Sequence, residues 1–222
     1  MKLSRTLFVS LLMVAIMAAV STWAMTRLPD APIPSHWALD GRPDRFADPA
    51  LVLFMLPAVA LALSLVFAVL PAIMPPRGDL SRSRTPYLAS WAGSVALMLV
   101  IHLAIVLQSL GVKVDIVRVV AIAVGALLLL IGNFLPKMRF NYLMGVRTPW
   151  TLADERVWDR TQRFSGLLMM AAGLIALAGG VLVAEPILLL ALIVVPTVGA
   201  ALVSVIYSAV ISPRVGRSGP AA

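Results

Sequence analysis

The amino-acid sequence predicts an all-α fold, a polytopic transmembrane helical bundle of six helices, from three observations. Apolar residues make up 61% of the chain and charged residues 13%, against roughly 45–50% and 25% in soluble domains. Six apolar runs approach the ~20 residues that a helix needs to cross a bilayer core. None of them alternates apolar with polar residues, as the strands of a membrane barrel do. The runs are 6–26, 50–72, 87–109, 114–135, 164–184 and 186–208.

The first run allows two interpretations, because MKLSR before an apolar segment is also typical of a secretion signal. Cleavage near Thr22-Trp23-Ala24 would remove residues 1–24 and leave five helices with an outside N-terminus. The apolar stretch from Thr6 to Met25 is longer than the core of a signal, which has about 7–15 residues. We therefore expect a retained first helix.

The later runs contain residues that shape helices. Pro57 and Pro196 lie inside the second and sixth runs, where proline bends a helix or leaves room for packing. Only residues 184–186, Ala-Glu-Pro, separate the last two runs, which predicts a tight helical hairpin. Small residues predict close helix contacts; they are Ala89 and Gly93 in the third run and Gly173, Ala176 and Gly180 in the fifth.

The positions of Lys and Arg predict the orientation. With a cytoplasmic N-terminus, 13 basic residues fall inside and five outside, and basic residues are enriched in cytoplasmic loops. We therefore expect both termini in the cytoplasm. The inside set is Lys2, Arg5, Arg77, Arg82, Arg84, Lys137, Arg139, Arg147, Arg156, Arg160, Arg163, Arg214 and Arg217, and the outside set is Arg27, Arg42, Arg45, Lys113 and Arg118.

The residue inventory argues against several functions. The chain has no cysteine, which rules out disulfides, thiolate metal sites and cysteine nucleophiles. Its basic excess comes with no nucleic-acid-binding motif, so we expect no direct nucleic-acid partner. No serine, histidine and acid are arranged for catalysis, and no carboxylate lies near the middle of a run, so we expect no enzyme and no cofactor. The deep polar residues are His102, Gln108 and Asn133. His102 is either a functional group or, as is commoner, a hydrogen-bond partner of a neighbouring helix.

The outer loop, residues 27–48, is rich in proline and is expected to be ordered. Residues 32–34, Pro-Ile-Pro, predict a short extended piece, and Asp40-Gly41 predicts a turn. One histidine, His36, among scattered aspartates fits no specific metal spacing. We expect a structural loop with Trp37 at the membrane interface and no metal site.

The inner loop, residues 136–163, is a basic segment with aromatic residues. Lys137 and Arg139 follow the fourth run, where the helix dipole and anionic lipid headgroups favour cations. Thr151 before Asp154 and Glu155 predicts an N-cap, and hence an amphipathic helix on the inner membrane face that continues into the fifth run. The loop suits two uses, recognition of a partner or interfacial anchoring by Phe140, Tyr142, Trp150 and Trp158.

Many inner-loop residues form one long and specific pattern: Asn133, Pro136, Lys137, Asn141, Tyr142, Gly145, Arg147, Thr148, Pro149, Trp150, Thr151, Leu152, Glu155, Val157, Trp158, Thr161, Arg163 and Gly166. This pattern resembles the signature of the SdpI family, bacterial membrane proteins named for an immunity protein against a secreted toxin. The outer loop, through Ile33, Pro34, His36, Trp37, Gly41, Pro43 and Asp44, resembles a domain of unknown function that often precedes that signature. Gln162 departs from the family, which usually has histidine there, so any role of that histidine is in question here.

The resemblance implies a multi-pass protein of the bacterial cytoplasmic (inner) membrane that protects against a secreted toxin and recruits a cytoplasmic transcriptional repressor. The implied partner-binding residues of the inner loop are Asn133, Pro136, Lys137, Arg139, Asn141, Tyr142, Gly145, Arg147, Thr148, Pro149, Trp150, Glu155, Trp158 and Arg163. Those of the outer loop are Pro34, His36, Trp37, Gly41, Pro43 and Asp44. An envelope-stress or lipid-related role without a toxin is the alternative, and a transporter is a third class.

The expected domain organisation has three parts. Residues 1–85 form a two-helix unit with the ordered outer loop, and residues 86–213 form a four-helix unit with the signature loop. Residues 214–222 form a disordered tail.

Overall fold

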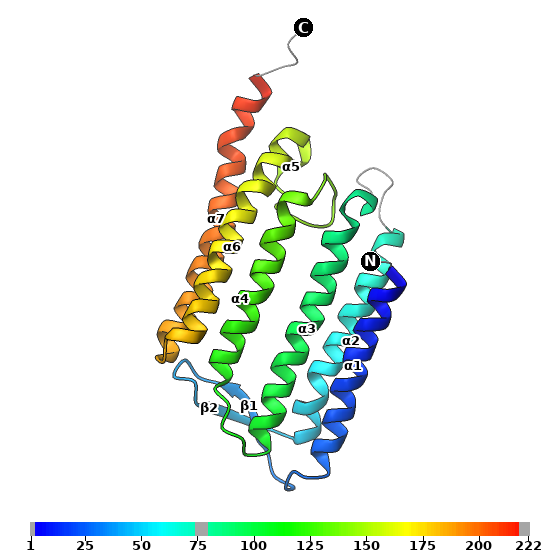
Figure 1. Cartoon of the computed structure of the whole chain (residues 1–222), viewed down its shortest axis with the longest axis vertical. Helices are drawn as coiled ribbons and strands as arrows, with labels where there is room; N and C mark the ends of the chain where they lie inside the picture. The colour runs from blue at the N-terminus through cyan, green and yellow to red at the C-terminus, as the bar shows by residue number, and fades with distance from the viewer. Residues whose placement is uncertain (1–2, 74–79, 218–222) are drawn as a thin grey trace.

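The computed structural model describes residues 3–73 and 80–217 as a bundle of helices (Figure 1). Six of the described helices are long and apolar enough to cross a membrane, which confirms the predicted class. They are α1 (Leu3–Met25), α2 (Pro49–Ile73), α3 (Arg84–Ser109), α4 (Ile116–Phe134), α6 (Glu155–Leu182) and α7 (Pro186–Arg217). The shorter elements are β1 (Ile33–Trp37), β2 (Pro43–Ala47), η1 (Leu80–Ser83), η2 (Leu135–Lys137) and α5 (Pro149–Ala153).

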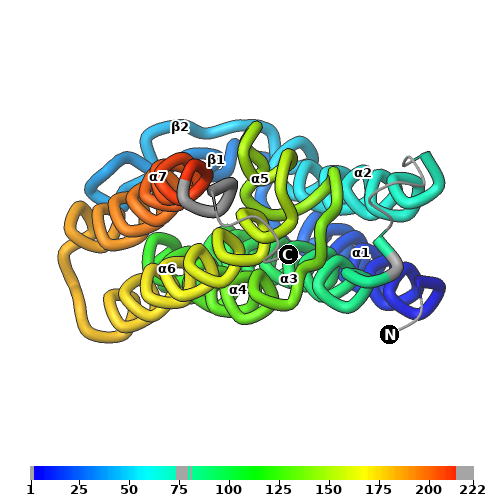
Figure 2. Tube along the Cα trace, turned by 90° about the horizontal axis from the view of Figure 1, so that it is seen from above, coloured from blue at the N-terminus to red at the C-terminus, as the bar shows by residue number. Residues whose placement is uncertain are grey.

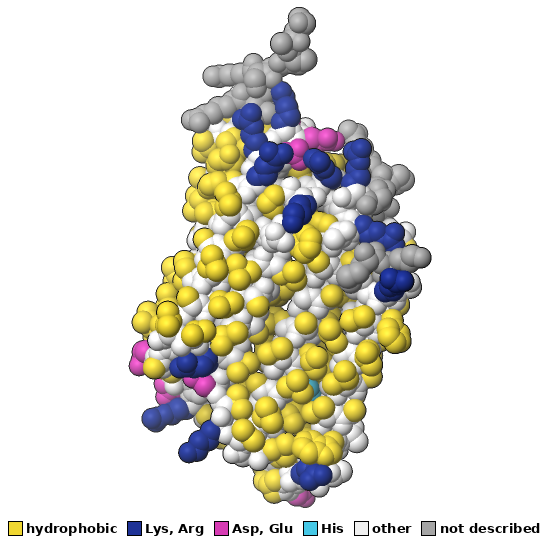
Figure 3. Space-filling view, viewed as in Figure 1, with side chains coloured by type: hydrophobic (Ala, Val, Ile, Leu, Met, Phe, Trp, Pro, Cys, Tyr) yellow, Lys and Arg dark blue, Asp and Glu magenta, His cyan; other side chains and the backbone are white. Residues whose placement is uncertain are grey.

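The connecting segments gather at two opposite ends of the bundle (Figure 1). The loop end holds α5 together with the starts of α1, α3 and α6, whereas the hairpin end holds β1 and β2. In Figure 3, apolar side chains cover the middle of one face, and Lys and Arg gather mainly at the loop end. A multi-pass membrane protein requires this distribution, because a charged side chain is costly at the bilayer centre.

The six long helices form two groups of three, which lie side by side when the bundle is seen from its loop end (Figure 2). Buried residues of α1, α2 and α3, such as Met17, Ala60 and Trp91, share one apolar cluster. Buried residues of α4, α6 and α7, such as Ala121, Ala176 and Leu189, share another. Helix α3 packs against α1, α2 and α4 and therefore joins the groups. The expected units 1–85 and 86–213 remain predictions.

Glycine residues bring α4 and α6 into close contact. A Cβ atom on Gly125 would lie 2.8 Å from the carbonyl oxygen of Gly173, and one on Gly173 would lie 2.8 Å from that of Gly125. Gly132 and Gly166 face each other in the same way. A Cβ on Gly180 would lie 2.6 Å from Ile122. The predicted close contact at Gly173 and Gly180 is confirmed, and the α4 glycines that complete it were not identified from sequence.

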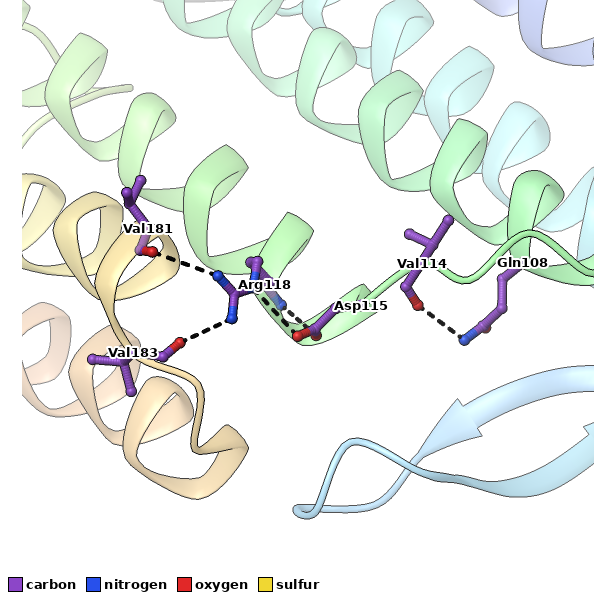
Figure 4. A network of polar contacts seen from close by, with 6 residues as sticks. All are labelled: Gln108, Val114, Asp115, Arg118, Val181 and Val183. Carbon is purple, nitrogen blue, oxygen red and sulfur yellow. Dashed lines mark hydrogen bonds and ion pairs between the residues drawn. The ribbon is translucent and has the colours of Figure 1, made fainter.

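Arg118 fastens the start of α4 to the end of α6 at the hairpin end (Figure 4). Asp115 caps α4 by accepting the backbone N–H of Arg118 at 3.0 Å. The Arg118 guanidinium donates to the carbonyl oxygens of Val183 at 3.2 Å and Val181 at 3.5 Å. Helix α6 ends beside these carbonyls, and a cation is favourable there because it satisfies the last carbonyls and opposes the helix dipole.

The outer loop folds as an antiparallel hairpin across the hairpin end (Figure 1). Ile33 of β1 is buried against Val52 and Leu53 of α2. The turn uses Gly41 at φ +78°, and a Cβ atom there would lie 3.5 Å from carbons of Val117 and Pro186. The predicted extended piece and turn are confirmed. The hairpin thus contacts both groups of helices.

The helix predicted to begin at Thr151 and continue into the fifth run is present, but it is broken in two at Asp154. Helix α5 ends at Ala153, and α6 begins at Glu155, where Asp154 caps it by accepting the backbone N–H of Arg156 at 2.7 Å. Helix α7 continues to Arg217, so the first residues of the predicted disordered tail, 214–217, are helical. The rest of that tail, 218–222, lies outside the described residues.

Candidate functional site

The inner loop crosses the loop end of the bundle and is tied down at its start by Asn141. This side chain is fully buried. Its amide oxygen accepts the backbone N–H groups of Leu143 and Met144 at 2.9 and 2.8 Å, and its amide nitrogen donates to the carbonyl oxygen of Arg139 at 2.9 Å. Leu143 and Met144 then pack against the cluster of α1, α2 and α3. Asn141 therefore has a structural role that fixes the path of the chain.

Ser83 joins the same loop to the start of α3. The Ser83 hydroxyl accepts the backbone N–H of Arg139 at 2.9 Å and lies 3.2 Å from the Arg139 carbonyl oxygen. The serine is fully buried. Sequence analysis did not identify this contact, because 56 residues separate the two partners.

Gln162 of α6 holds the middle of the loop at Val146. Its side-chain oxygen accepts the Val146 N–H at 3.0 Å, and its NH₂ group donates to the Val146 carbonyl at 3.1 Å. Gly145 has φ +98°, and a Cβ atom on it would lie 2.7 Å from the Gln162 oxygen. The residue that departs from the family pattern is thus a fully buried structural clamp in this chain.

Thr148 starts α5 and connects the loop to α7. Its hydroxyl accepts the backbone N–H of Thr151 at 3.3 Å and lies 3.1 Å from the hydroxyl of Ser208 on α7. Thr151 returns the cap by accepting the Thr148 N–H at 2.8 Å. The prediction that Thr151 is the N-cap was therefore wrong. Pro149 explains the earlier start, because it suits the first helical position and holds Thr148 in the extended conformation of an N-cap.

One interpretation of the sequence made Trp158 an interfacial anchor, and the structure contradicts it. The side chain is fully buried, and its indole N–H donates to the carbonyl of Met138 at 3.0 Å. Phe140 meets it edge-on with ring centroids 5.5 Å apart. Trp158 therefore lies inside the bundle and does not face lipid. Trp150, in contrast, is 38% exposed.

The predicted inner-loop residues therefore divide into a buried and an exposed set. Asn141, Thr148 and Trp158 are buried and build the loop. Tyr142 is half-buried. The exposed residues are Asn133, Pro136, Lys137, Arg139, Gly145, Arg147, Pro149, Trp150, Glu155 and Arg163. The Arg147 guanidinium donates to the carbonyl of Tyr142 at 2.6 Å and so closes the chain between residues 142 and 147, directly before Pro149 and Trp150 in sequence.

Charged groups of the loop end form a mixed surface. Arg139 pairs with Asp159 at 3.7 Å, and Arg156 pairs with Asp154 at 3.0 Å. The hydrogen bond from the Arg156 side chain, together with backbone N–H donors, lowers the pKa of Asp154. Arg160 and Arg163 are exposed and form no ion pair with another described residue. The surface is therefore rich in guanidinium groups, which suit carboxylates and phosphates.

The outer-loop residues lie on the hairpin at the opposite end. His36 Nδ1 lies 2.6 Å from Asp44 Oδ1, and this hydrogen bond lowers the pKa of Asp44. Pro34 pairs with Phe46 and Trp37 pairs with Pro43 across the strands. Among the described residues, no three His, Asp or Glu side chains come together as a metal site would require.

The second histidine, His102, is a buried link between α3 and α1. Its Nε2 lies 3.1 Å from the Ser21 hydroxyl and 3.2 Å from the Met17 carbonyl oxygen. Ser21 is itself fully buried and donates to the Leu53 carbonyl of α2 at 2.7 Å. The expected hydrogen bond of His102 to a neighbouring helix is confirmed, and Ser21 is a partner that sequence analysis missed.

Comparison with known proteins finds two matching families, one over a range that includes the inner loop and one over a range that includes the hairpin. The SdpI/YfhL protein family matches residues 137–208, and a domain of unknown function, DUF1648, matches residues 12–61. The chain is 29% identical over 187 residues to "Immunity protein SdpI" of Bacillus subtilis (strain 168), which covers 84% of this chain and 87% of that protein. It is 32% identical over 72 residues to "Uncharacterized protein YfhL" of the same organism, covering 31% of this chain and 66% of that protein. No solved structure gives a significant match.

Proposed function

Because the chain belongs to the SdpI/YfhL protein family, we propose that it is an immunity and signal-transduction protein that protects its bacterial cell against a secreted toxin. The observation that supports this most is the 29% identity to an immunity protein over 84% of the chain. Its place is the cytoplasmic membrane, with the loop end inside, since 13 of the 18 basic residues belong to the segments assigned to that side.

The inner loop is the proposed docking surface for a cytoplasmic repressor. Arg147, Pro149 and Trp150 are exposed on one short turn, which a buried scaffold holds in place. Trp and Arg are among the residue types enriched at binding hot spots. Contact residues therefore come from the exposed set, whereas Asn141, Thr148 and Trp158 act by shaping the loop.

The hairpin is the part of the chain that a toxin outside the cell would meet first. Two large apolar side chains stand out from it, Leu39 at 69% and Phe46 at 59% exposure. The hairpin also touches the starts of α4 and α7, so a ligand bound there would press on both groups of helices.

Survival of toxin-treated cells tests the proposal. Cells that lack an immunity gene would express either the parent chain or the Arg147→Ala variant and be exposed to medium from toxin-secreting bacteria. Membrane levels of the two chains would be matched by immunoblotting. Protection by the parent and its loss in the variant support the proposed function and place it on the inner loop. If cells that express the parent chain are as sensitive to the toxin as cells that express neither chain, the proposal is overturned.

A matched variant separates contact from scaffold. Arg147→Lys keeps the positive charge but cannot reproduce the planar fork of a guanidinium. Arg160→Gln removes an exposed charge elsewhere on the same end and is expected to retain protection. If Arg147→Ala and Arg160→Gln reduce survival equally, general surface charge and not the turn at Arg147 carries the effect.

A further inference from the structure

A membrane-exposed groove runs between α3 and α4, where the two groups of helices meet. It has a volume of about 280 Å³. All of its lining side chains are apolar or absent: Gly93, Ala96, Leu97 and Val100 of α3, and Ala123, Ala126, Leu127 and Leu130 of α4. The small residues Ala96, Ala123 and Ala126 make it a hollow and not a ridge. Such a lining suits a hydrocarbon chain, because a polar ligand group buried against it would have no hydrogen-bond partner.

A cluster of cations lies at the loop end of the same two helices. Arg82 and Arg84 flank Ser83 at the start of α3, and the Ser83 hydroxyl is hydrogen-bonded to the backbone of Arg139. Lys137 precedes Arg139 by two residues and is the last residue of η2. All four cations are exposed. Arg139 is partly offset by Asp159 at 3.7 Å, and the Lys137 ammonium donates to Asn133 at 3.2 Å. The cluster keeps an excess of positive charge where the helices leave the bilayer.

The distances between cluster and groove fit one phospholipid. Leu130 precedes Lys137 by seven residues, which is about 10 Å of helix at ~1.5 Å per residue. The groove then extends over residues 130 to 123, about 10 Å further. When the phosphate of a phospholipid lies at the cluster, the acyl chain of the same lipid therefore lies alongside the groove. Anionic headgroups are attracted to basic residues at this level of the membrane.

We propose that the α3–α4 groove and the cluster of Arg82, Arg84, Lys137 and Arg139 form a binding site for one anionic phospholipid. The acyl chain fills the groove and the phosphate lies among the cations. The ligand would join the two groups of helices at their contact, independently of any toxin.

Native mass spectrometry of the full chain tests this site. The protein, purified in mild detergent and stripped of lipid, would be titrated with phosphatidylglycerol or with phosphatidylcholine carrying identical acyl chains. We expect one phosphatidylglycerol to be retained in preference to phosphatidylcholine. Arg82→Gln and Arg84→Gln should each reduce that preference by about fivefold, and Arg84→Lys should restore it. Arg42→Gln and Arg45→Gln on the hairpin are the matched controls and should have no effect.

A second substitution tests the groove separately from the cluster of cations. Ala126 is exposed in it, so Ala126→Phe fills the hollow without displacing buried neighbours. We expect this variant to lose retention of the lipid, whereas Ala201→Phe on the exposed face of α7 should keep it. A circular dichroism melt checks that both variants fold. Should either be misfolded, Ala123→Leu gives the same test with a smaller change.

Three outcomes would overturn the proposal. Equal retention of the two lipids excludes headgroup selection. Displacement of the lipid by water-soluble glycerol phosphate, with no effect of Ala126→Phe, indicates a site for free phosphate only. A change in the dimer population on Ala126→Phe, with lipid retention unchanged, indicates that a second copy of the chain occupies the groove. None of these results depends on toxin protection.

Discussion

Gln162 hydrogen-bonds both backbone polar groups of Val146, with its oxygen 3.0 Å from the Val146 nitrogen and its nitrogen 3.1 Å from the Val146 carbonyl oxygen. A side-chain amide can make this pair because its donor and acceptor lie side by side, as those of a backbone neighbour in a sheet do. The contact holds the inner loop against α6 across 16 residues of sequence. It gives the loop one path, on which the exposed turn at Arg147 depends.

Replacement of Gln162 by leucine should destabilise the inner loop. The Val146 N–H loses its acceptor while it stays partly buried, which costs about 1–3 kcal/mol. Thermal unfolding in detergent would measure the loss, and limited proteolysis would locate it within residues 138–148. The stability of Gln162→His should lie between that of the parent and that of Gln162→Leu. The two ring nitrogens of histidine point in divergent directions, so they can keep only one of the two hydrogen bonds to Val146. Unchanged protease resistance in Gln162→Leu would show that the clamp does not hold the loop.

Gly145→Ala should destabilise the protein more than Gly111→Ala. Both glycines have positive φ, +98° and +86°, so both substitutions carry similar backbone strain. Only at position 145 does the new Cβ meet a neighbour, at 2.7 Å from the Gln162 oxygen, whereas nothing lies within 4 Å at position 111. The larger loss of melting temperature at position 145 therefore reports the collision with Gln162. Equal shifts would mean that the Gln162 side chain moves aside freely.

Gly173→Ala should separate α4 from α6. The added Cβ would lie 2.8 Å from the Gly125 carbonyl and 2.8 Å from the Leu129 nitrogen, and backbone atoms cannot rotate away. Overpacking of this kind typically costs about 1–3 kcal/mol. Gly199→Ala on α7 is the matched control, since nothing lies within 4 Å of it. Unfolding followed by circular dichroism should show a lower midpoint for position 173 only, and a lower midpoint for both would point to a general effect of the substitution.

The number of spans was predictable from sequence because apolar run length is set by bilayer thickness and not by the neighbours of a helix. The hairpin turn was predictable for a similar reason, since Gly41 supplies a positive φ locally. The helix from Thr151 into the fifth run was predicted as continuous, whereas the structure divides it into α5 and α6 at Asp154, which is extended and caps α6. Residue pattern predicts that such a segment is helical but does not show a break of one residue within it.

The inner loop was recognised from its residues, but their division into scaffold and surface was not. Trp158 and Trp150 are both tryptophans of the inner loop and could not be told apart from sequence. In the structure, Trp158 is fully buried and Trp150 is 38% exposed. Which way each side chain points follows from the break at Asp154 and from the contacts of Ser83 and Ser208, which come from distant parts of the chain. Such tertiary partners leave no local trace in sequence.

Arg118→Gln should loosen the hairpin end of the bundle. The guanidinium joins the start of α4 to the Val181 and Val183 carbonyls at the end of α6 (Figure 4). Its removal leaves these carbonyls with one donor fewer, at a cost of about 1 kcal/mol. Hydrogen exchange in residues 181–186 should become faster while exchange at the loop end stays unchanged. Arg42→Gln, on the exposed hairpin turn, is the control, and equal acceleration in both variants would refute the role of Arg118.

Asp154→Asn should leave α6 capped at acidic pH but remove the pH dependence of the cap. The pKa of Asp154 is lowered in the folded chain below its ordinary value of 3.8 by hydrogen bonds from Arg156. A carboxylate with a lowered folded pKa contributes stability that is fully present above the unfolded value and is lost as pH falls through the folded one. As far as this group is concerned, the midpoint temperature of unfolding of the parent should therefore be constant from about pH 8 to 5. It should decrease when the pH is lowered below about 4. Asparagine also caps helices, so the variant should lose about 1 kcal/mol or less at neutral pH and show a weaker decline in acid. Parallel pH profiles for parent and variant would show that Asp154 is not the group responsible.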